Sequence, residues 1–74
     1  MSANYPELHV DWIVDLRHRM KLNYETLENF ADSNKLNYLD CFWFFKGNPV
    51  VEESFKGICN VLDCDWEKVQ LPHI

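Results

Sequence analysis

The chain has 74 residues, which is enough for one domain and too few for a second. A hydrophobic fraction of 47% with only two Gly and three Pro excludes a disordered chain, and a net charge of −5 disfavours binding to phosphate polymers. No run approaches the roughly 18 apolar residues of a membrane span and no export signal is present, so we expect one cytoplasmic domain over 1–74, with its core at about 8–71.

The first predicted helix covers about 6 to 21. Pro6 suits a first helical turn, and Trp12, Leu16 and Met20 recur at helical spacing, so one face of this segment should be buried. The sequence therefore predicts an amphipathic helix that begins at or near Pro6.

The charges of this helix are ordered along it. Asp15 and Arg19 lie four residues apart, which predicts an ion pair on one helix face. The basic residues near its end are Arg17, His18, Arg19 and Lys21. Positive charge there complements the helix dipole, and a phosphate-binding patch is the alternative interpretation.

A short second helix is predicted up to about Ser33. Asn23 is its expected N-cap, and Leu27, Phe30 and Ala31 form its apolar face. About four polar residues then lead to the next helix, a separation typical of a helix-turn-helix.

The third helix carries the most apolar stretch of the chain. Asn37 is the expected N-cap, and Gly47 ends the helix after Lys46. One arc, predicted to face the core, holds Tyr38, Cys41, Phe44 and Phe45. The opposite arc holds Leu39, Phe42, Trp43 and Lys46.

Both arcs of this helix are largely apolar, and a domain of this size cannot bury a helix on all sides. We therefore expect one arc to contact a protein partner, and a homodimer is the expected form of that contact. The predicted partner-binding residues are Leu39, Asp40, Phe42, Trp43 and Lys46. The alternative is that all of these rings belong to an unusually aromatic core.

Two further helices complete the predicted fold. The fourth is expected at about 52 to 62, with a buried stripe, and the fifth is a single turn at 66–69 capped by Asp65. The stripe of the fourth helix consists of Phe55, Ile58, Cys59 and Leu62. The fold class predicted from the sequence is all-α, with five short helices.

The sequence indicates neither an enzyme nor a cofactor site. Cys41, Cys59 and Cys64 are an odd number in a chain without a secretion signal, so they are expected to be free thiols, and their spacing does not fit a zinc site. There is no Gly-rich phosphate loop and no interpretable Ser, His and Asp set. A non-catalytic protein without a cofactor is therefore expected.

The order of these helices resembles the Cro/C1-type helix-turn-helix domain over about 8 to 71. A narrower likeness covers 44–59, Leu62 and 65–69, where an aromatic pair, a Pro, a Phe and Ile-Cys precede a Trp-Glu turn. It resembles the small helix-turn-helix-like module at the N-terminus of cyanobacterial NB-ARC-type and related signalling ATPases. That resemblance implies a role in recruiting or regulating other proteins.

The broader fold also implies an alternative function, a DNA-binding transcriptional regulator acting as a dimer. Its DNA-reading members present polar or basic side chains from the third helix to base edges, whereas here only Lys46 suits DNA and Asp40 opposes it. The residues that a dimer could gather against DNA are Arg17, Arg19, Lys21, Lys35 and Lys46.

Overall fold

A computed structural model describes residues 5–71, in which five helices and one isolated backbone bridge form the fold. The helices are α1 Val10–Tyr24, α2 Leu27–Ser33, α3 Tyr38–Lys46, α4 Glu52–Val61 and α5 Trp66–Val69. The predicted all-α class with five helices is confirmed, and four residues separate α2 from α3 as expected. In the described range, no helix has the length and hydropathy needed to span a bilayer. The remaining residues of the predicted 1–74 domain, 1–4 and 72–74, lie outside that range.

The first helix begins later than predicted. α1 starts at Val10 rather than near Pro6, and His9 is its N-cap, with the imidazole Nδ1 accepting a hydrogen bond from the Asp11 N–H at 3.1 Å. Pro6 lies before the helix and is buried. A proline fits an extended segment as well as a first helical turn, so its presence alone did not place the helix start.

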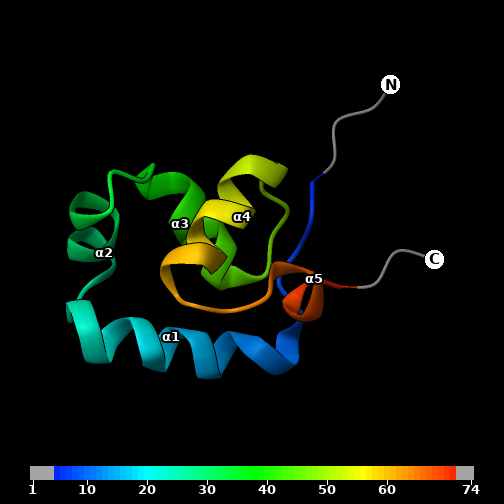
Figure 1. Ribbon diagram of the computed structural model, residues 1–74, viewed down its shortest axis with the longest axis horizontal. Helices are drawn as coiled ribbons and strands as arrows, with labels where there is room; N and C mark the ends of the chain where they lie inside the picture. Colours follow the sequence, from blue (N-terminus) through cyan, green and yellow to red (C-terminus); the bar gives the residue numbers. More distant parts are fainter. Residues whose placement is uncertain (1–4, 72–74) are drawn as a thin grey trace.

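Residues 5–9 are held instead by distant parts of the chain. This segment lies beside the end of the described chain and beside the loop that follows α3 (Figure 1). Three backbone hydrogen bonds join them: His9 N–H to the Val69 carbonyl at 2.7 Å, Leu71 N–H to Glu7 at 2.8 Å, and Val50 N–H to Pro6 at 3.2 Å. These long-range bonds satisfy backbone groups that a helix would otherwise have used.

The junction between α1 and α2 also differs from the prediction. Asn23 lies inside α1, where its side-chain amide donates to the Arg19 carbonyl at 3.0 Å. The N-cap of α2 is Thr26, whose hydroxyl accepts from the Asn29 N–H at 3.1 Å. Glu25, with a positive φ of 68°, ends α1 between them. The break between α1 and α2 therefore falls at Glu25, two residues beyond Asn23, the residue that was predicted to cap α2.

Replacing Thr26 with Ala is expected to lower the free energy of unfolding by about 1 kcal/mol, because the cap bond to Asn29 is lost. The matched change Asn23→Ala should cost less than about 0.5 kcal/mol, since its bond is exposed and lies within α1. Urea denaturation of both variants measures the difference. A larger loss at Asn23 than at Thr26 would contradict this assignment of the cap.

The third helix has the boundaries that the sequence predicted. The Asn37 side chain accepts from the Asp40 N–H at 3.1 Å, and Gly47 adopts the left-handed conformation at φ 80°. A Cβ at position 47 would lie 3.0 Å from Cδ1 of Ile13, so the glycine also permits the close approach of α1. The predicted Asp65 cap of α5 is likewise confirmed, through a bond from the Glu67 N–H at 3.0 Å.

The centre of the molecule is a cluster of phenylalanine rings from three helices. Phe44 of α3 lies with its centroid 5.0 Å from that of Phe45 and 5.0 Å from that of Phe55 in α4, and Phe30 of α2 lies 5.8 Å from Phe45. The four rings are buried. Edge-to-face and tilted contacts of this kind add to the free energy of apolar burial, so α3 is anchored to the core along one whole face.

The three cysteines are free thiols in different surroundings. Burial, with a smaller effect of Asp40, raises the pKa of Cys41 to about 11, so neutral Cys41 contributes stability below pH 9.0 that is lost as the pH rises through about 11. The Cys64 thiol donates to the Cys59 carbonyl at 3.6 Å. The neighbouring Cys64 side chain and burial raise the pKa of Cys59. The Cys59 side chain lowers the pKa of half-buried Cys64 against the effect of burial, and Arg19 acts in the same direction as Cys59.

Iodoacetamide at pH 8 should therefore label Cys64 first, while Cys41 and Cys59 react only when the domain opens. Mass spectrometry of proteolytic fragments over time measures the order. A Cys64→Ser variant should lose the fast phase, and urea should equalise the remaining thiols. Fast labelling of Cys41 in the native protein would contradict this order.

Candidate protein-binding surface

The outer side of α3 carries two large exposed apolar residues. Leu39 is 59% exposed and Trp43 is 44% exposed, whereas Phe44 and Phe45 on the inner side are 0% and 4% exposed. The helix therefore has one buried face and one face open to solvent. Trp43 is not a core residue, so an arrangement with every ring of α3 in the core does not hold.

Phe42 and Tyr38 extend this outer side into a row of rings. Phe42 is half-buried, with its centroid 5.1 Å from Trp43 and 6.4 Å from the nearly parallel ring of Tyr38. Lys46 Nζ lies 5.2 Å from the Phe42 centroid. Tyr38 was predicted to face the core, but its side chain is exposed because it occupies the first turn of α3, beyond the edge of the phenylalanine cluster.

Asp40, the acidic member of the predicted surface, contacts another helix. Its carboxylate accepts a hydrogen bond of 2.7 Å from the Ser54 hydroxyl of α4, and the residue is half-buried. This contact joins the first turns of α3 and α4. In the described structure Asp40 therefore supports the packing of the two helices.

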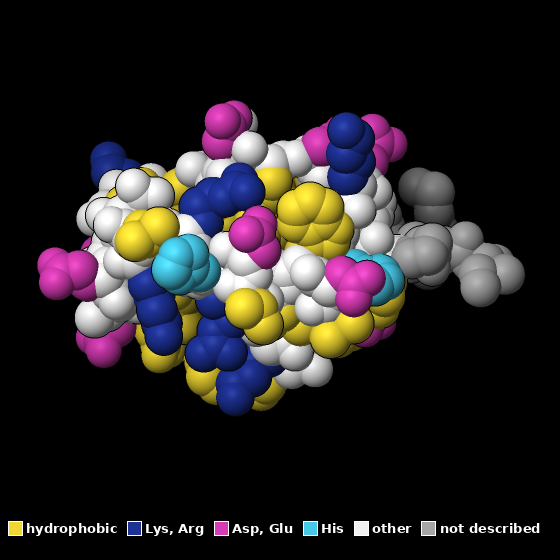
Figure 2. Space-filling view, turned by 90° about the horizontal axis from the view of Figure 1, so that it is seen from below, with side chains coloured by type: hydrophobic (Ala, Val, Ile, Leu, Met, Phe, Trp, Pro, Cys, Tyr) yellow, Lys and Arg dark blue, Asp and Glu magenta, His cyan; other side chains and the backbone are white. Residues whose placement is uncertain are grey.

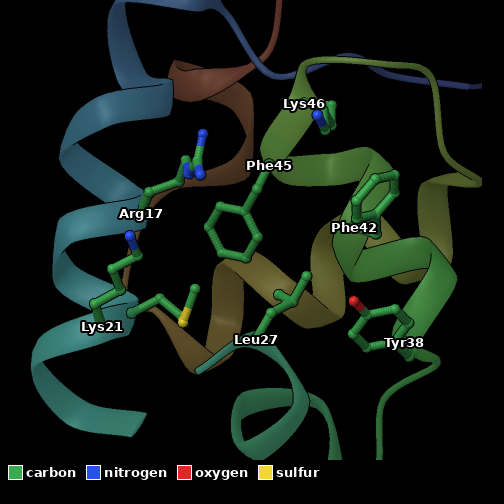
Figure 3. Close-up of a pocket in the computed structure, with 8 residues that line it drawn as sticks. Arg17, Lys21, Leu27, Tyr38, Phe42, Phe45 and Lys46 are labelled. Carbon is green, nitrogen blue, oxygen red and sulfur yellow. The ribbon is translucent and has the colours of Figure 1, made fainter. Parts of the chain in front are cut away.

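A groove of about 240 Å³ lies between α1 and α3, with the start of α2 at one end. Figure 3 shows Arg17 and Lys21 on the α1 wall, Phe42, Tyr38 and Lys46 on the α3 wall, and Phe45 and Leu27 between them. Its lining consists of Arg17, Met20, Lys21, Leu27, Tyr38, Phe42, Phe45 and Lys46. We call this hollow the basic groove.

The structure does not bring together the five cations predicted for DNA. Arg17, Lys21 and Lys46 line the basic groove. Arg19 instead pairs with Asp15 at 3.2 Å, as the spacing predicted, and donates to the Leu62 carbonyl at the end of α4. Lys35 lies in the α2–α3 turn with a φ of 55°. The set is therefore divided between three regions of the surface.

Sequence reasoning missed a second exposed apolar stripe, on α1. Val10, Val14 and Leu22 are 67%, 77% and 71% exposed. Figure 2, which views the molecule from the side of α1, shows hydrophobic side chains interspersed with Lys and Arg on this face. The spacing of four between Val10 and Val14, and of eight between Val14 and Leu22, was a signal of this stripe, but the stronger stripe of Leu16 and Met20 took precedence.

Comparisons with known proteins do not assign a function to these surfaces. A scan against models of protein families, a search of curated proteins and a search of solved structures returned no match to this chain. Within residues 5–71, no three His, Cys, Asp or Glu side chains converge as ligands for a metal ion. The exposed side of α3 and the basic groove adjoin each other, because Phe42 lines the groove and its ring contacts that of Trp43.

Proposed function

We propose that this protein is a non-catalytic protein-interaction module that binds through the α3 face, defined as Leu39, Phe42 and Trp43. The observation that supports the proposal is the exposure of Leu39 and Trp43 on a helix whose opposite side is the centre of the core. The buried side fixes the position of α3, so the exposed rings are held ready without further ordering. A surface of this kind loses little conformational entropy on binding.

The composition of the α3 face suits a protein partner. Aromatic side chains dominate the energetics of protein interfaces, and Lys46 stands at the rim, where a cation can remain partly hydrated. Trp43 is 44% exposed and Phe42 is half-buried, so each ring offers less than half of the roughly 150–250 Å² of a large aromatic side chain, and the exposed Leu39 adds to this apolar surface.

A second copy of the chain is the partner that this proposal places first. A two-fold contact would pack the α3 face of one copy against the α3 face of the other, so that each Trp43 contacts the rings of the second copy. Such a contact would need to bury roughly 1,200 Å² in total to be specific, and the rings of both chains would form its centre.

Replacing Trp43 with Ala is expected to weaken association by more than about 1 kcal/mol, or roughly fivefold in Kd, while the domain stays folded. Sedimentation equilibrium at micromolar concentration measures the association, and circular dichroism checks the fold. Leu22→Ala, which removes a more exposed apolar side chain from α1 (71% against 44% for Trp43), is the control.

Two outcomes count against the proposed self-association. A wild-type protein that sediments as a clean monomer of 8.9 kDa excludes a tight homodimer. A Trp43→Ala variant that unfolds would assign this ring to stability rather than to an interface.

A dimeric DNA-binding regulator is a second candidate, supported by the position of Arg17, Lys21 and Lys46 around one groove. Binding to duplex DNA would then weaken steeply with salt. Against it stand the exposed Leu39 and Trp43, which cannot pair with base edges. Absence of detectable binding to mixed genomic fragments at low salt would remove this candidate.

A further inference from the structure

The basic groove differs in charge from the rest of the molecule. Three of its eight lining residues are cations and none is Asp or Glu within the described range, although the whole chain carries a net charge of −5. Random placement of the seven Lys and Arg among twelve acidic residues would more often mix the signs. The groove is therefore a positive site on a negative protein, which favours an anionic ligand over other contacts.

The cations of the basic groove have no carboxylate partner among the described residues, a state that they share with Lys35 and Lys68. Arg19 pairs with Asp15 and Lys56 with Glu52, each four residues earlier on its helix. In contrast, no carboxylate of the described chain lies within ion-pair distance of Arg17, Lys21 or Lys46. The residue four before Lys21 is Arg17 itself, and like charges at this spacing repel. An anion bound between them would relieve that repulsion.

The floor of the groove is apolar. Phe45 and Met20 form part of it and are almost fully buried, and Leu27 of α2 is half-buried at one end. The Tyr38 side chain lies across from Leu27, on the opposite wall (Figure 3). A ligand matched to this lining has a bulky apolar part for the floor and negative charge for the rim.

The size of the groove suits a single side chain better than a whole small molecule. Its volume of about 240 Å³ is below the roughly 300–1,000 Å³ of sites that enclose drug-sized ligands. Its walls come from two separate helices, α1 and α3, so the space suits one anchoring side chain of a longer chain that passes between them. This is the geometry of peptide recognition.

We propose that the basic groove binds an acidic peptide segment of a partner protein. The segment places one bulky apolar side chain over Phe45 and Met20, and its carboxylates lie against Arg17, Lys21 and Lys46. The inference rests on the proposed role in protein interaction, but it uses the groove rather than the exposed Leu39 and Trp43. Phe42 belongs to both surfaces, so mutations separate them at Trp43 on the α3 face and at Arg17 and Lys21 in the groove.

A neighbouring hollow limits how far a negative ligand can extend. Glu28 and Asp32 of α2 line it together with Tyr38, which also lines the basic groove. A long polyanion such as a nucleic acid would meet these carboxylates as it passed Tyr38. A short acidic segment can end before them, so the charge of this edge favours a peptide over a phosphate polymer.

The test is a selection of random 12-residue peptides, displayed on phage, against the immobilised full chain. The enriched peptides should combine Asp or Glu with Trp, Phe or Leu. A fluorescein-labelled copy of the most enriched peptide is then titrated by anisotropy. The double variant R17Q/K21Q should weaken binding roughly five- to tenfold, and added salt should weaken it further. Lys35→Gln, which removes an exposed cation outside the groove, should leave Kd unchanged.

The contrary outcomes are distinct. Enrichment of basic or uncharged peptides, no enrichment, equal binding by R17Q/K21Q and wild type, or displacement of the peptide by a short oligonucleotide would each overturn the proposal. Loss of self-association in R17Q/K21Q would assign the groove to a second copy and also overturn it. Failure of the α3-face proposal is recognised separately, because Trp43→Ala would then leave all association unchanged while R17Q/K21Q still weakened peptide binding.

Discussion

Replacing Phe44 with Ala is expected to lower the free energy of unfolding by about 3–5 kcal/mol. The ring is 0% exposed and contacts Phe45 and Phe55, with centroids 5.0 Å away in both cases, so its removal leaves a cavity where α3 and α4 meet. A domain of 74 residues has a total stability of roughly 4–11 kcal/mol, so the variant should be close to unfolding at room temperature.

Urea denaturation followed by circular dichroism measures this loss. Leu39→Ala on the opposite side of the same helix is the matched control, and it should change the unfolding free energy by less than about 0.5 kcal/mol because the side chain is 59% exposed. Equal losses in the two variants would contradict the assignment of an inner and an outer face to α3.

The second large effect is expected at Leu8, in the extended segment before α1. This side chain is 1% exposed and forms part of the core, and its backbone pairs with Gln70. Leu8→Ala should therefore cost about 2–5 kcal/mol. Val10→Ala, two residues later and 67% exposed, should cost less than about 0.5 kcal/mol.

Thermal denaturation of both variants measures the contrast. A small loss for Leu8→Ala would show that residues 5–9 contribute little to the fold, and that the domain is held by its helices alone.

The parts of the fold that the sequence predicted correctly depend on local signals. The boundaries of α3 follow from Asn37 and Gly47, and the cap of α5 follows from Asp65, because each of these residues bonds to backbone groups within one helical turn. The predicted start of α1 was wrong because residues 5–9 are held by hydrogen bonds to Val69 and Val50, which lie more than forty residues further along the chain. No local pattern reports such bonds.

The candidate site shows the same division. Helical periodicity placed Leu39 and Trp43 on the side opposite to Phe44, and both are exposed. The same periodicity placed Tyr38 in the core, but this side chain is exposed. A periodic pattern carries no information on where the neighbouring helices end. The basic groove could not be predicted, since α1 and α3 contribute its cations from positions that become adjacent only after folding.

The bonds between residues 5–9 and 69–71 place the two ends of the described chain next to each other (Figure 1). A chain whose ends meet can be inserted into a surface loop of another protein, or can be closed by a short linker and reopened elsewhere. The α2–α3 turn, with exposed Lys35, offers such an opening. This arrangement would make the domain portable as a cassette, because both host segments would join it at neighbouring points of its surface.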